Sequence, residues 1–158
     1  MRKKILTKDH SIDFMKLSEV ERSRLAMAVD TDGCITYNYY NDHAYAYPTF
    51  VFTGASLLPI KLWERYGGAI QNYRPTIFKW IIKRREALQD FLRAVQPYLL
   101  IKREQCEIAL QMLGLLLEKP AKLPGYPGWK QKTLYLAEEL NRSNSEYKHP
   151  KITLEEFS

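Results

Sequence analysis

The chain has few of the residues that build disulfide frameworks or structural zinc sites. Only two cysteines occur among its 158 residues, Cys34 and Cys106, and there is no CxxC pair or Cys/His ligand spacing. We therefore expect neither a disulfide framework nor a zinc site. This composition favours a reducing intracellular compartment, either the cytoplasm of a prokaryote or an organelle or the nucleus of a eukaryote.

Long apolar segments are also missing. No run of about 18 apolar residues occurs, and the N-terminal MRKKILTKDHSIDF has no apolar core of secretory length, so we expect no membrane partner. The chain is of a length that fits one domain, which we predict over residues 1–158. An excess of 24 Lys and Arg over 18 Asp and Glu gives a net charge of +6. This basic excess favours a polyanionic partner without naming one.

Hydrophobic periodicity predicts helices that alternate with two β-hairpins. A helix is expected over about 18–31, because Ser18 and Glu21 have capping-box spacing and Gly33 can take the positive φ that ends a helix. Aromatic and β-branched residues predict strands over about 34–40 and 44–53, joined by the turn NDH. A second hairpin is predicted over AIQNY and IFKWIIK. Further helices are predicted in LLPIKLWERYGG, EALQDFLRAVQPYLL, IKREQCEIALQMLGLLLEK and QKTLYLAEELNRSN.

This order of elements predicts an α+β fold. Two hairpins can form one antiparallel sheet of four strands with the helices packed on one face, which leaves the other face free. The loop KLPGYPGW precedes the last helix, and the polar tail over about 145–158 is expected to be partly mobile.

The stretch LAMAVDTDG, Leu25 to Gly33, places two carboxylates at the end of the first long helix. A helix C-terminus favours cations, so acids there need a reason. One interpretation is that Asp30 and Asp32 only form the turn after the helix. An EF-hand is excluded, because its fifth and twelfth positions would fall on Cys34 and Asn41.

With the helix-hairpin-helix-hairpin order that follows it, this motif resembles the LAGLIDADG homing endonuclease family, in its single-motif homodimeric type. The motif matches at Leu25, Ala26, Asp30, Asp32 and Gly33, and the glycine pair after the second helix and FLRAVQPYLLIKREQ extend the resemblance over about 15–120. The resemblance implies an αββαββα fold with a saddle-shaped sheet. It also implies a nuclease, a hydrolase of phosphodiester bonds that cuts double-stranded DNA at a long near-palindromic site for intron homing. Such an enzyme would be intron-encoded and act as a homodimer.

The resemblance also implies roles for single residues. Asp32 would bind the catalytic metal, supplemented by the main-chain carbonyl of Thr31, while Asp30 would have a structural role at the helix end. Mg²⁺ suits these hard oxygen ligands, and Mn²⁺ or Ca²⁺ could occupy the same site. Lys102 matches the family's active-site lysine, although its sequence context alone equally fits a solvated cation, and Arg103 could be the contact instead.

Helix packing in the dimer is expected to involve one side of the motif helix, and three positions depart from the family pattern. The residues predicted at the dimer interface are Leu25, Ala26, Val29 and Asp30. Met27 replaces a small residue and would loosen the helix contact. Gly54 stands where a polar residue often helps to position solvent, and Leu58, which stands where some members have a basic residue, is expected in the core.

Alternation along the strands predicts a DNA-binding face. The predicted contacts are Thr36, Asn38, Tyr40, Tyr45, Tyr47 and Thr49 on the first hairpin and Asn72, Arg74, Lys79, Ile81 and Lys83 on the second. Arg offers a bidentate donor to guanine, which favours base or phosphate contacts here. The alternatives are an aromatic cluster that lies wholly in the core and a basic edge strand that is only solvated.

Three functions remain open on the sequence. The first is the metal-dependent endonuclease, and the second is a cleavage-deficient protein on the same scaffold, either an intron RNA maturase or a DNA-binding regulator. The third is a small-molecule enzyme that uses the Asp pair as acid and base. It is disfavoured because the chain has no nucleophile constellation, phosphate-binding glycine loop or His partner. Cys34 and Cys106 are expected to be buried apolar residues.

Overall fold

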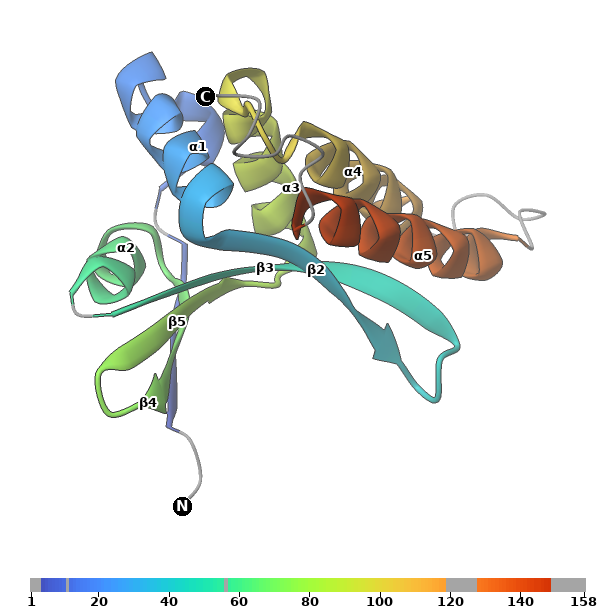
Figure 1. Cartoon of the computed structure of the whole chain (residues 1–158), viewed down its shortest axis with the longest axis horizontal. Helices are drawn as coiled ribbons and strands as arrows, with labels where there is room; N and C mark the ends of the chain where they lie inside the picture. Colours follow the sequence, from blue (N-terminus) through green and yellow to red (C-terminus); the bar gives the residue numbers. More distant parts are fainter. Residues whose placement is uncertain (1–3, 11, 56, 119–127, 149–158) are drawn as a thin grey trace, which may run out of the picture.

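The computed structural model of the chain describes residues 4–10, 12–55, 57–118 and 128–148. Helices and hairpins follow one another in the predicted order, which confirms the α+β class (Figure 1). The strands are β1 (Ile5–Lys8), β2 (Gly33–Tyr40), β3 (Tyr45–Ala55), β4 (Gly68–Arg74) and β5 (Ile77–Ile82). The helices are α1 (Glu19–Asp32), α2 (Leu58–Tyr66), α3 (Arg85–Val95), α4 (Arg103–Leu117) and α5 (Trp129–Lys148), with 3-10 turns η1 (Phe14–Lys16) and η2 (Gln96–Tyr98).

The sheet has five antiparallel strands in the order β1-β4-β5-β3-β2, one more than predicted. The additional strand is β1, in which all residues are exposed, so its sequence lacks the alternation that marks a half-buried strand. The helices lie on one side of the arched sheet, and none of the described helices covers its concave side (Figure 1). We call this uncovered side the open face.

The motif helix α1 runs into β2 without a loop. The side chain of Ser18 caps its start by accepting from the N–H of Glu21 at 3.2 Å, as predicted. The reason predicted for Gly33 was wrong, because its φ is −80° and the backbone is extended. Glycine is needed for close packing instead, since an added Cβ would lie 2.7 Å from Cε2 of Phe50 and 2.8 Å from Cα of Val29. The end of α1 is thereby held tightly against β3.

The positive φ of glycine is used at the end of α2 instead. Gly67 and Gly68 have φ values of 79° and 95° and turn the chain into β4. The indole nitrogens of Trp80 and Trp63 donate to the carbonyls of these two glycines at 2.8 and 3.1 Å. Below this turn an aromatic core joins the sheet to α3, where Phe91 contacts the rings of Phe50, Trp80 and Phe14.

Two helices after the second hairpin complete the cover of the sheet. The break predicted near Pro97 is present as η2, between α3 and α4. Helix α5 continues to Lys148, past the predicted end near residue 144, and is tied to the first hairpin by hydrogen bonds from Ala46 N to Thr133 Oγ1 and from Asn144 Nδ2 to the carbonyl of Ile35. The predicted loop KLPGYPGW lies outside the described residues up to position 127, and so does the predicted tail from position 149 onward, whereas residues 145–148 of that tail belong to α5. Among the helices that are described, none is long and apolar enough to cross a bilayer.

Candidate active site and open sheet face

The two acids of the motif differ in their surroundings. Asp30 is 5% exposed, and its carboxylate accepts hydrogen bonds from the N–H groups of Leu100, Ile101 and Lys102 at 2.8, 3.2 and 3.0 Å. Asp30 therefore fixes the segment before α4 to the end of α1, which is a structural role. Asp32, two residues on, is exposed and is the last residue of α1.

Lys102 lies directly behind this end of the helix and is also 5% exposed. Its Nζ donates to the carbonyl of Val29 at 2.9 Å and to the carbonyl of Gly33, and these two carbonyls lie on either side of Asp32 in the chain. Burial lowers the pKa of this amino group, and the nearby Cys34, Asp30 and Asp32 act in the opposite direction. Arg103, the other candidate cation, donates its Nε to the carbonyl of Leu99 at 2.6 Å. Lys102 thus contacts the main chain of the LAMAVDTDG motif, whereas Arg103 contacts the segment before α4.

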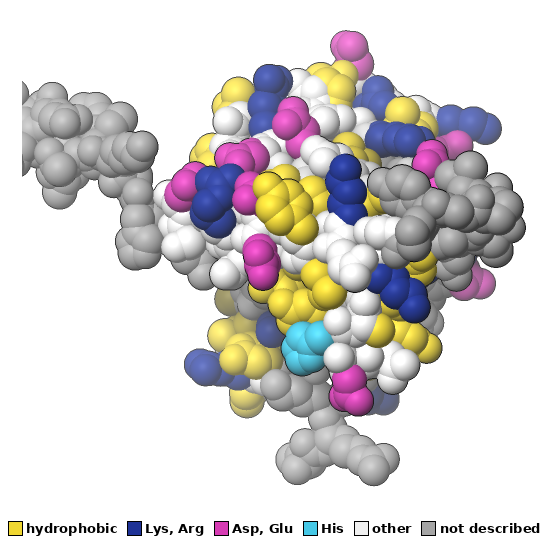
Figure 2. Space-filling view, turned by 90° about the vertical axis from the view of Figure 1, so that its right-hand side faces the viewer, with side chains coloured by type: hydrophobic (Ala, Val, Ile, Leu, Met, Phe, Trp, Pro, Cys, Tyr) yellow, Lys and Arg dark blue, Asp and Glu magenta, His cyan; other side chains and the backbone are white. Residues whose placement is uncertain are grey.

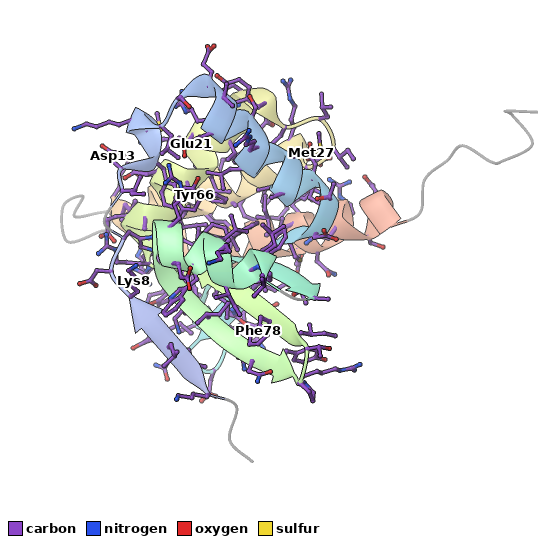
Figure 3. The ribbon with its side chains drawn as sticks, turned by 90° about the vertical axis from the view of Figure 1, so that its left-hand side faces the viewer. Lys8, Asp13, Glu21, Met27, Tyr66 and Phe78 are labelled. Atoms are coloured by element: carbon purple, nitrogen blue, oxygen red, sulfur yellow. The ribbon has the colours of Figure 1, made fainter. Side chains whose placement is uncertain are left out.

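A pocket of about 420 Å³ opens between α1 and α2 beside Asp32. Glu21 and Met27 of α1 and Tyr66 at the end of α2 lie along it (Figure 3). The cations that line it are Arg24, Lys61 and Arg65, of which sequence reasoning missed the two arginines and considered Lys61 only as a surface lysine that could contact phosphates. No sequence motif marks these three residues, since they come together only through the packing of α2 beside α1.

Two of the predicted departures from the family pattern also lie at this pocket or behind it. Leu58 was wrongly predicted in the core, because it lines the pocket and is 53% exposed. Gly54 lies under the start of α2, where an added Cβ would come 3.3 Å from Cγ of Pro59. A larger residue at position 54 would press against α2, so glycine permits this close packing.

The side of α1 that was predicted for a dimer contact is turned inward. Leu25, Ala26, Val29 and Asp30 are at most 5% exposed, because this side of the helix packs on α3, β3 and η2. These four residues, which were predicted at a dimer interface, are covered by the chain's own elements and so offer almost no surface to a second copy. The outward side of α1 instead carries Val20 and Met27, which are 62% and 59% exposed.

Oxygen ligands for a divalent cation are present at the end of α1, in the carboxylate of Asp32 and the carbonyl of Thr31. Within the described residues, no group of three His, Cys, Asp or Glu side chains could hold a metal ion. Mg²⁺ usually retains waters and takes one or two carboxylates together with phosphate oxygens, so a single exposed carboxylate fits this cation. The donor set therefore suits a metal that also binds a phosphate.

The open face carries polar rows across neighbouring strands. Strand register pairs Thr36 with Thr49, Asn38 with Tyr47, and Tyr40 with Tyr45 on the first hairpin, which confirms that these residues alternate with the core residues. Two of them are less accessible than predicted. Thr49 is 3% exposed and its hydroxyl accepts from Asn38 at 3.4 Å, while the hydroxyl of Tyr45 accepts from Arg85 and its ring lies 5.2 Å from Trp129.

The two remaining tyrosines of β2 lie on the opposite face from Tyr40. Tyr37 and Tyr39 lie on the helix side, and the ring of Tyr39 packs 4.1 Å from His43 in the turn. Figure 2 looks onto the end of the molecule at which the β2–β3 hairpin turns, and it shows hydrophobic side chains beside a histidine. Cys34 was predicted to be buried but is exposed at the start of β2, whereas Cys106 is buried as predicted.

One residue of the second hairpin was assigned to the wrong face. Asn72 pairs with Phe78, and both line a pocket beneath α2, so Asn72 does not share the face of Lys79. An irregularity between Asn72 and Arg74 shifts the alternation, and Arg74 pairs with Ile77 on the open face. Sequence reasoning thereby missed Gln71, which pairs with Lys79, and Tyr73, whose ring lies 4.1 Å from the Lys79 amino group.

Known structures share this geometry. The structure of an archaeal intron-encoded homing endonuclease, I-Vdi141I, bound to DNA superposes on this chain with a TM-score of 0.65 and 15% identity, covering 87% of this chain and 92% of that one. The fold is that of a LAGLIDADG homing endonuclease. I-CvuI in complex with DNA gives a TM-score of 0.56 at 19% identity over 84% of this chain and 97% of that one.

A third homing endonuclease, I-SmaMI bound to DNA, differs in length. It gives a TM-score of 0.61 at 18% identity and covers 85% of this chain, but this chain covers only 50% of I-SmaMI. No family model and no curated protein sequence matches the chain. The likeness to homing endonucleases is therefore one of fold.

Proposed function

We propose that the protein is a divalent-metal-dependent endonuclease that hydrolyses double-stranded DNA at a long near-palindromic site and acts as a homodimer. The observation that carries this proposal is the exposed Asp32, which ends α1 beside the open face while Asp30 and Lys102 hold the backbone around it. A rigidly held carboxylate next to a free, partly basic sheet suits chemistry on a bound polyanion.

Asp32 and the carbonyl of Thr31 would bind Mg²⁺, with Mn²⁺ or Ca²⁺ as substitutes. When bound, such an ion supplies positive charge that stabilises the phosphate oxygens during hydrolysis. Structures of I-CvuI with DNA were determined in the presence of Mg or Ca, which is consistent with this class of cation. The hydroxyl of Thr31 donates to the carbonyls of Met27 and Ala28, which stabilises the last turn of α1 and so the direction of the carboxylate.

Lys102 has a positioning role in this proposal. Its amino group binds the carbonyls before and after Asp32, so it fixes the backbone from which the carboxylate projects. Its positive charge also lies close enough to Asp30 and Asp32 to interact electrostatically with both. Loss of this side chain would therefore affect the carboxylate geometry before it affects DNA binding.

A second copy of the chain would cover the outward side of α1. Met27 on α1 and Leu58 at the start of α2 are exposed apolar residues that line the pocket beside Asp32, and Val20 on α1 and Leu57 before α2 are further exposed apolar residues. A two-fold contact there would bring two Asp32 carboxylates together and match the symmetry of a near-palindromic site. The length of I-SmaMI supports this arrangement, because two copies of this chain correspond to one I-SmaMI chain.

The open face would lie against DNA. The proposed contacts retain Thr36, Asn38, Tyr40, Tyr47, Arg74, Lys79, Ile81 and Lys83, and add Gln71 and Tyr73 in place of Asn72. Gln is a bidentate partner for adenine and Arg for guanine, so both kinds of base could be read from this face. Thr49 and Tyr45 would not contact bases, because the hydroxyl of Thr49 binds Asn38 and the hydroxyl of Tyr45 binds Arg85.

We also propose that the gene lies within an intron and that the protein works in a reducing intracellular compartment. I-Vdi141I and I-CeuI, which share the fold, are intron-encoded. Both cysteines are free thiols, as expected in such a compartment. A target sequence that spans the insertion point of the intron would support the first part of this proposal.

A randomised library of double-stranded DNA tests the function. The purified protein is incubated with the library in Mg²⁺ and separately in EDTA, and bound and cut molecules are sequenced. Cuts in Mg²⁺ alone, at one near-palindromic sequence, are expected. Binding without cutting in either condition would favour a DNA-binding regulator, and binding to folded intron RNA alone would favour a maturase.

A further inference from the structure

A depression on the open face is lined by the apolar Ala69 and Ile81 and surrounded by charged and polar side chains, namely the cations Lys8, Lys83 and Arg84 together with Asp9 and His10. Strand register aligns Thr7, Ala69 and Ile81 across β1, β4 and β5, and these side chains line a pocket of about 130 Å³. We propose that this pocket binds the methyl edge of a thymine in the major groove. This inference rests on the proposed function, since it names the base recognised by the same DNA-binding face.

The pocket belongs to an apolar row that crosses the sheet. Ile81 pairs with Val51, and Val51 pairs with Cys34, so the row continues from the floor of the pocket to β2. Polar rows lie on both sides: Thr53, Lys79 and Gln71 on one, and Thr36 and Thr49 on the other. The apolar row is thus flanked by polar residues on β2, β3, β4 and β5, while Ile5 and Ile77 are further apolar residues of the same face.

The chemistry of the major groove selects the base that fits an apolar floor. Thymine is the only base that presents a methyl group there, whereas adenine and cytosine present amino groups and guanine presents acceptors. An amino group or acceptor over Ala69 and Ile81 would lose water without gaining a partner from these side chains, which is unfavourable. A methyl group over the same side chains gains the free energy of apolar burial.

The rim of the pocket carries positively charged side chains, which favour a nucleic acid over a protein as the partner. Lys83 and Arg84 are exposed at the end of β5, whereas the amino group of Lys8 is bound to the carbonyl of Glu64 at 2.7 Å. Five strands spaced about 4.8 Å apart span about 19 Å, which exceeds the major groove width of about 12 Å. The edge strands β1 and β2 must then lie near the phosphates, whereas Lys83 and Arg84 follow the central strand β5 and would contact the phosphate backbone beyond the end of that strand, next to the thymine.

Replacement of thymine by uracil tests the methyl contact without changing the protein. With the half-site selected from the library, each thymine is replaced in turn by uracil and the dissociation constant is measured in EDTA. At one position the wild-type protein should bind about fourfold more weakly, as expected for removal of one methyl group. The same position should show stronger binding to 5-methylcytosine than to cytosine.

A matched pair of variants connects the effect to the pocket. Ile81→Ala should remove the difference between thymine and uracil at that position, whereas Ile101→Ala, an exposed isoleucine before α4, should keep it. Lys83→Ala combined with Arg84→Ala should keep the methyl effect but reduce the slope of log affinity against log salt by about 0.9 for each phosphate that is no longer neutralised. Thermal unfolding shows whether Ile81→Ala remains folded, and Ile81→Val, a smaller truncation, should give a partial loss of the methyl effect.

The outcomes separate this inference from the proposed function. Wild-type binding that is equally tight with uracil at every thymine would overturn the thymine subsite, and so would an undiminished methyl effect in Ile81→Ala. If Mg²⁺-dependent cutting persists in either case, the proposed endonuclease stands and only the subsite is wrong. Failure to bind any DNA sequence would overturn both.

Discussion

The carboxylate of Asp30 accepts the main-chain N–H of Lys102 at 3.0 Å, while the amino group of Lys102 donates to the carbonyl of Val29, next to Asp30, at 2.9 Å. The Asp30 side chain thus binds the main chain of Lys102, and the Lys102 side chain binds the main chain next to Asp30. Because both are almost fully buried, the end of α1 and the start of α4 form one unit. Asp32 is the acid that this unit leaves exposed.

Replacing the buried acid should therefore cost stability, whereas replacing the exposed one should not. Asp30→Ala removes the acceptor for three N–H groups and should lower the free energy of unfolding by about 2–4 kcal/mol, because a buried donor left unpaired costs about 1–3 kcal/mol and the exposed Leu100 and Ile101 can donate to water instead. Asp32→Asn, the matched control, should change it by less than about 0.5 kcal/mol. Urea denaturation measures both, and equal effects would contradict the assigned roles.

Gly33 should be intolerant of any side chain. Gly33→Ala places a Cβ against Phe50 and the backbone of Val29, so the free energy of unfolding should fall by about 1–3 kcal/mol. Gly114→Ala is the control, because it lies in α4 with nothing within 4 Å of the added Cβ. This variant should raise stability by about 0.5–1 kcal/mol through helix propensity. A harmless Gly33→Ala would show that α1 can move away from β3.

Stability should fall at mildly acidic pH through His10. Its Nδ1 lies 2.7 Å from the carbonyl of Tyr66, and burial lowers its pKa below 6.5, with Arg84 acting in the same direction and the Tyr66 carbonyl and Asp9 opposing it. The unfolded chain then binds the proton more readily than the folded chain, so stability is lost as pH falls below about 6.5. His10→Gln should flatten this part of a plot of unfolding free energy against pH. A slope identical to that of the wild type would exclude His10 as its source.

Association should depend on the outward side of α1. Met27→Glu puts a charge into the proposed contact and should convert dimers into monomers in sedimentation equilibrium, because an unpaired charge at an apolar interface is costly. Tyr135→Glu changes an equally exposed residue on α5 and should leave the dimer intact. A Met27→Glu protein that remains dimeric would place the contact elsewhere.

Much of the fold could be predicted because its elements carry local signals. Ser18 caps α1 as its spacing predicts, and the alternation of Ile35 and Phe50 with polar neighbours marks β2 and β3. The motif itself identified the end of α1, where Asp32 and Lys102 come within electrostatic range although they lie 70 positions apart along the chain. The two residues that the motif resemblance paired, Asp32 and Lys102, are thus close together in the structure.

The errors arose where a neighbour in space decides the outcome. The irregularity after Asn72 shifts the face of the following residues, and nothing in the sequence of β4 marks it. The inward side of α1 is fixed by packing on α3 and β3, because apolar residues such as Val29 and Met27 occur on both sides of the helix. Strand β1 exists only through its pairing with β4, since its own residues are all exposed.

DNA cleavage by the Asp32→Asn variant tests most directly whether Asp32 binds the catalytic metal. The variant and the wild type are compared on the selected DNA site, with cutting measured in Mg²⁺ and binding measured in EDTA. We expect that the variant folds and binds the DNA site like the wild type but no longer cuts it, because it loses the charged ligand for the metal. Undiminished Mg²⁺-dependent cutting by the Asp32→Asn variant would show that Asp32 is not the ligand of the catalytic metal.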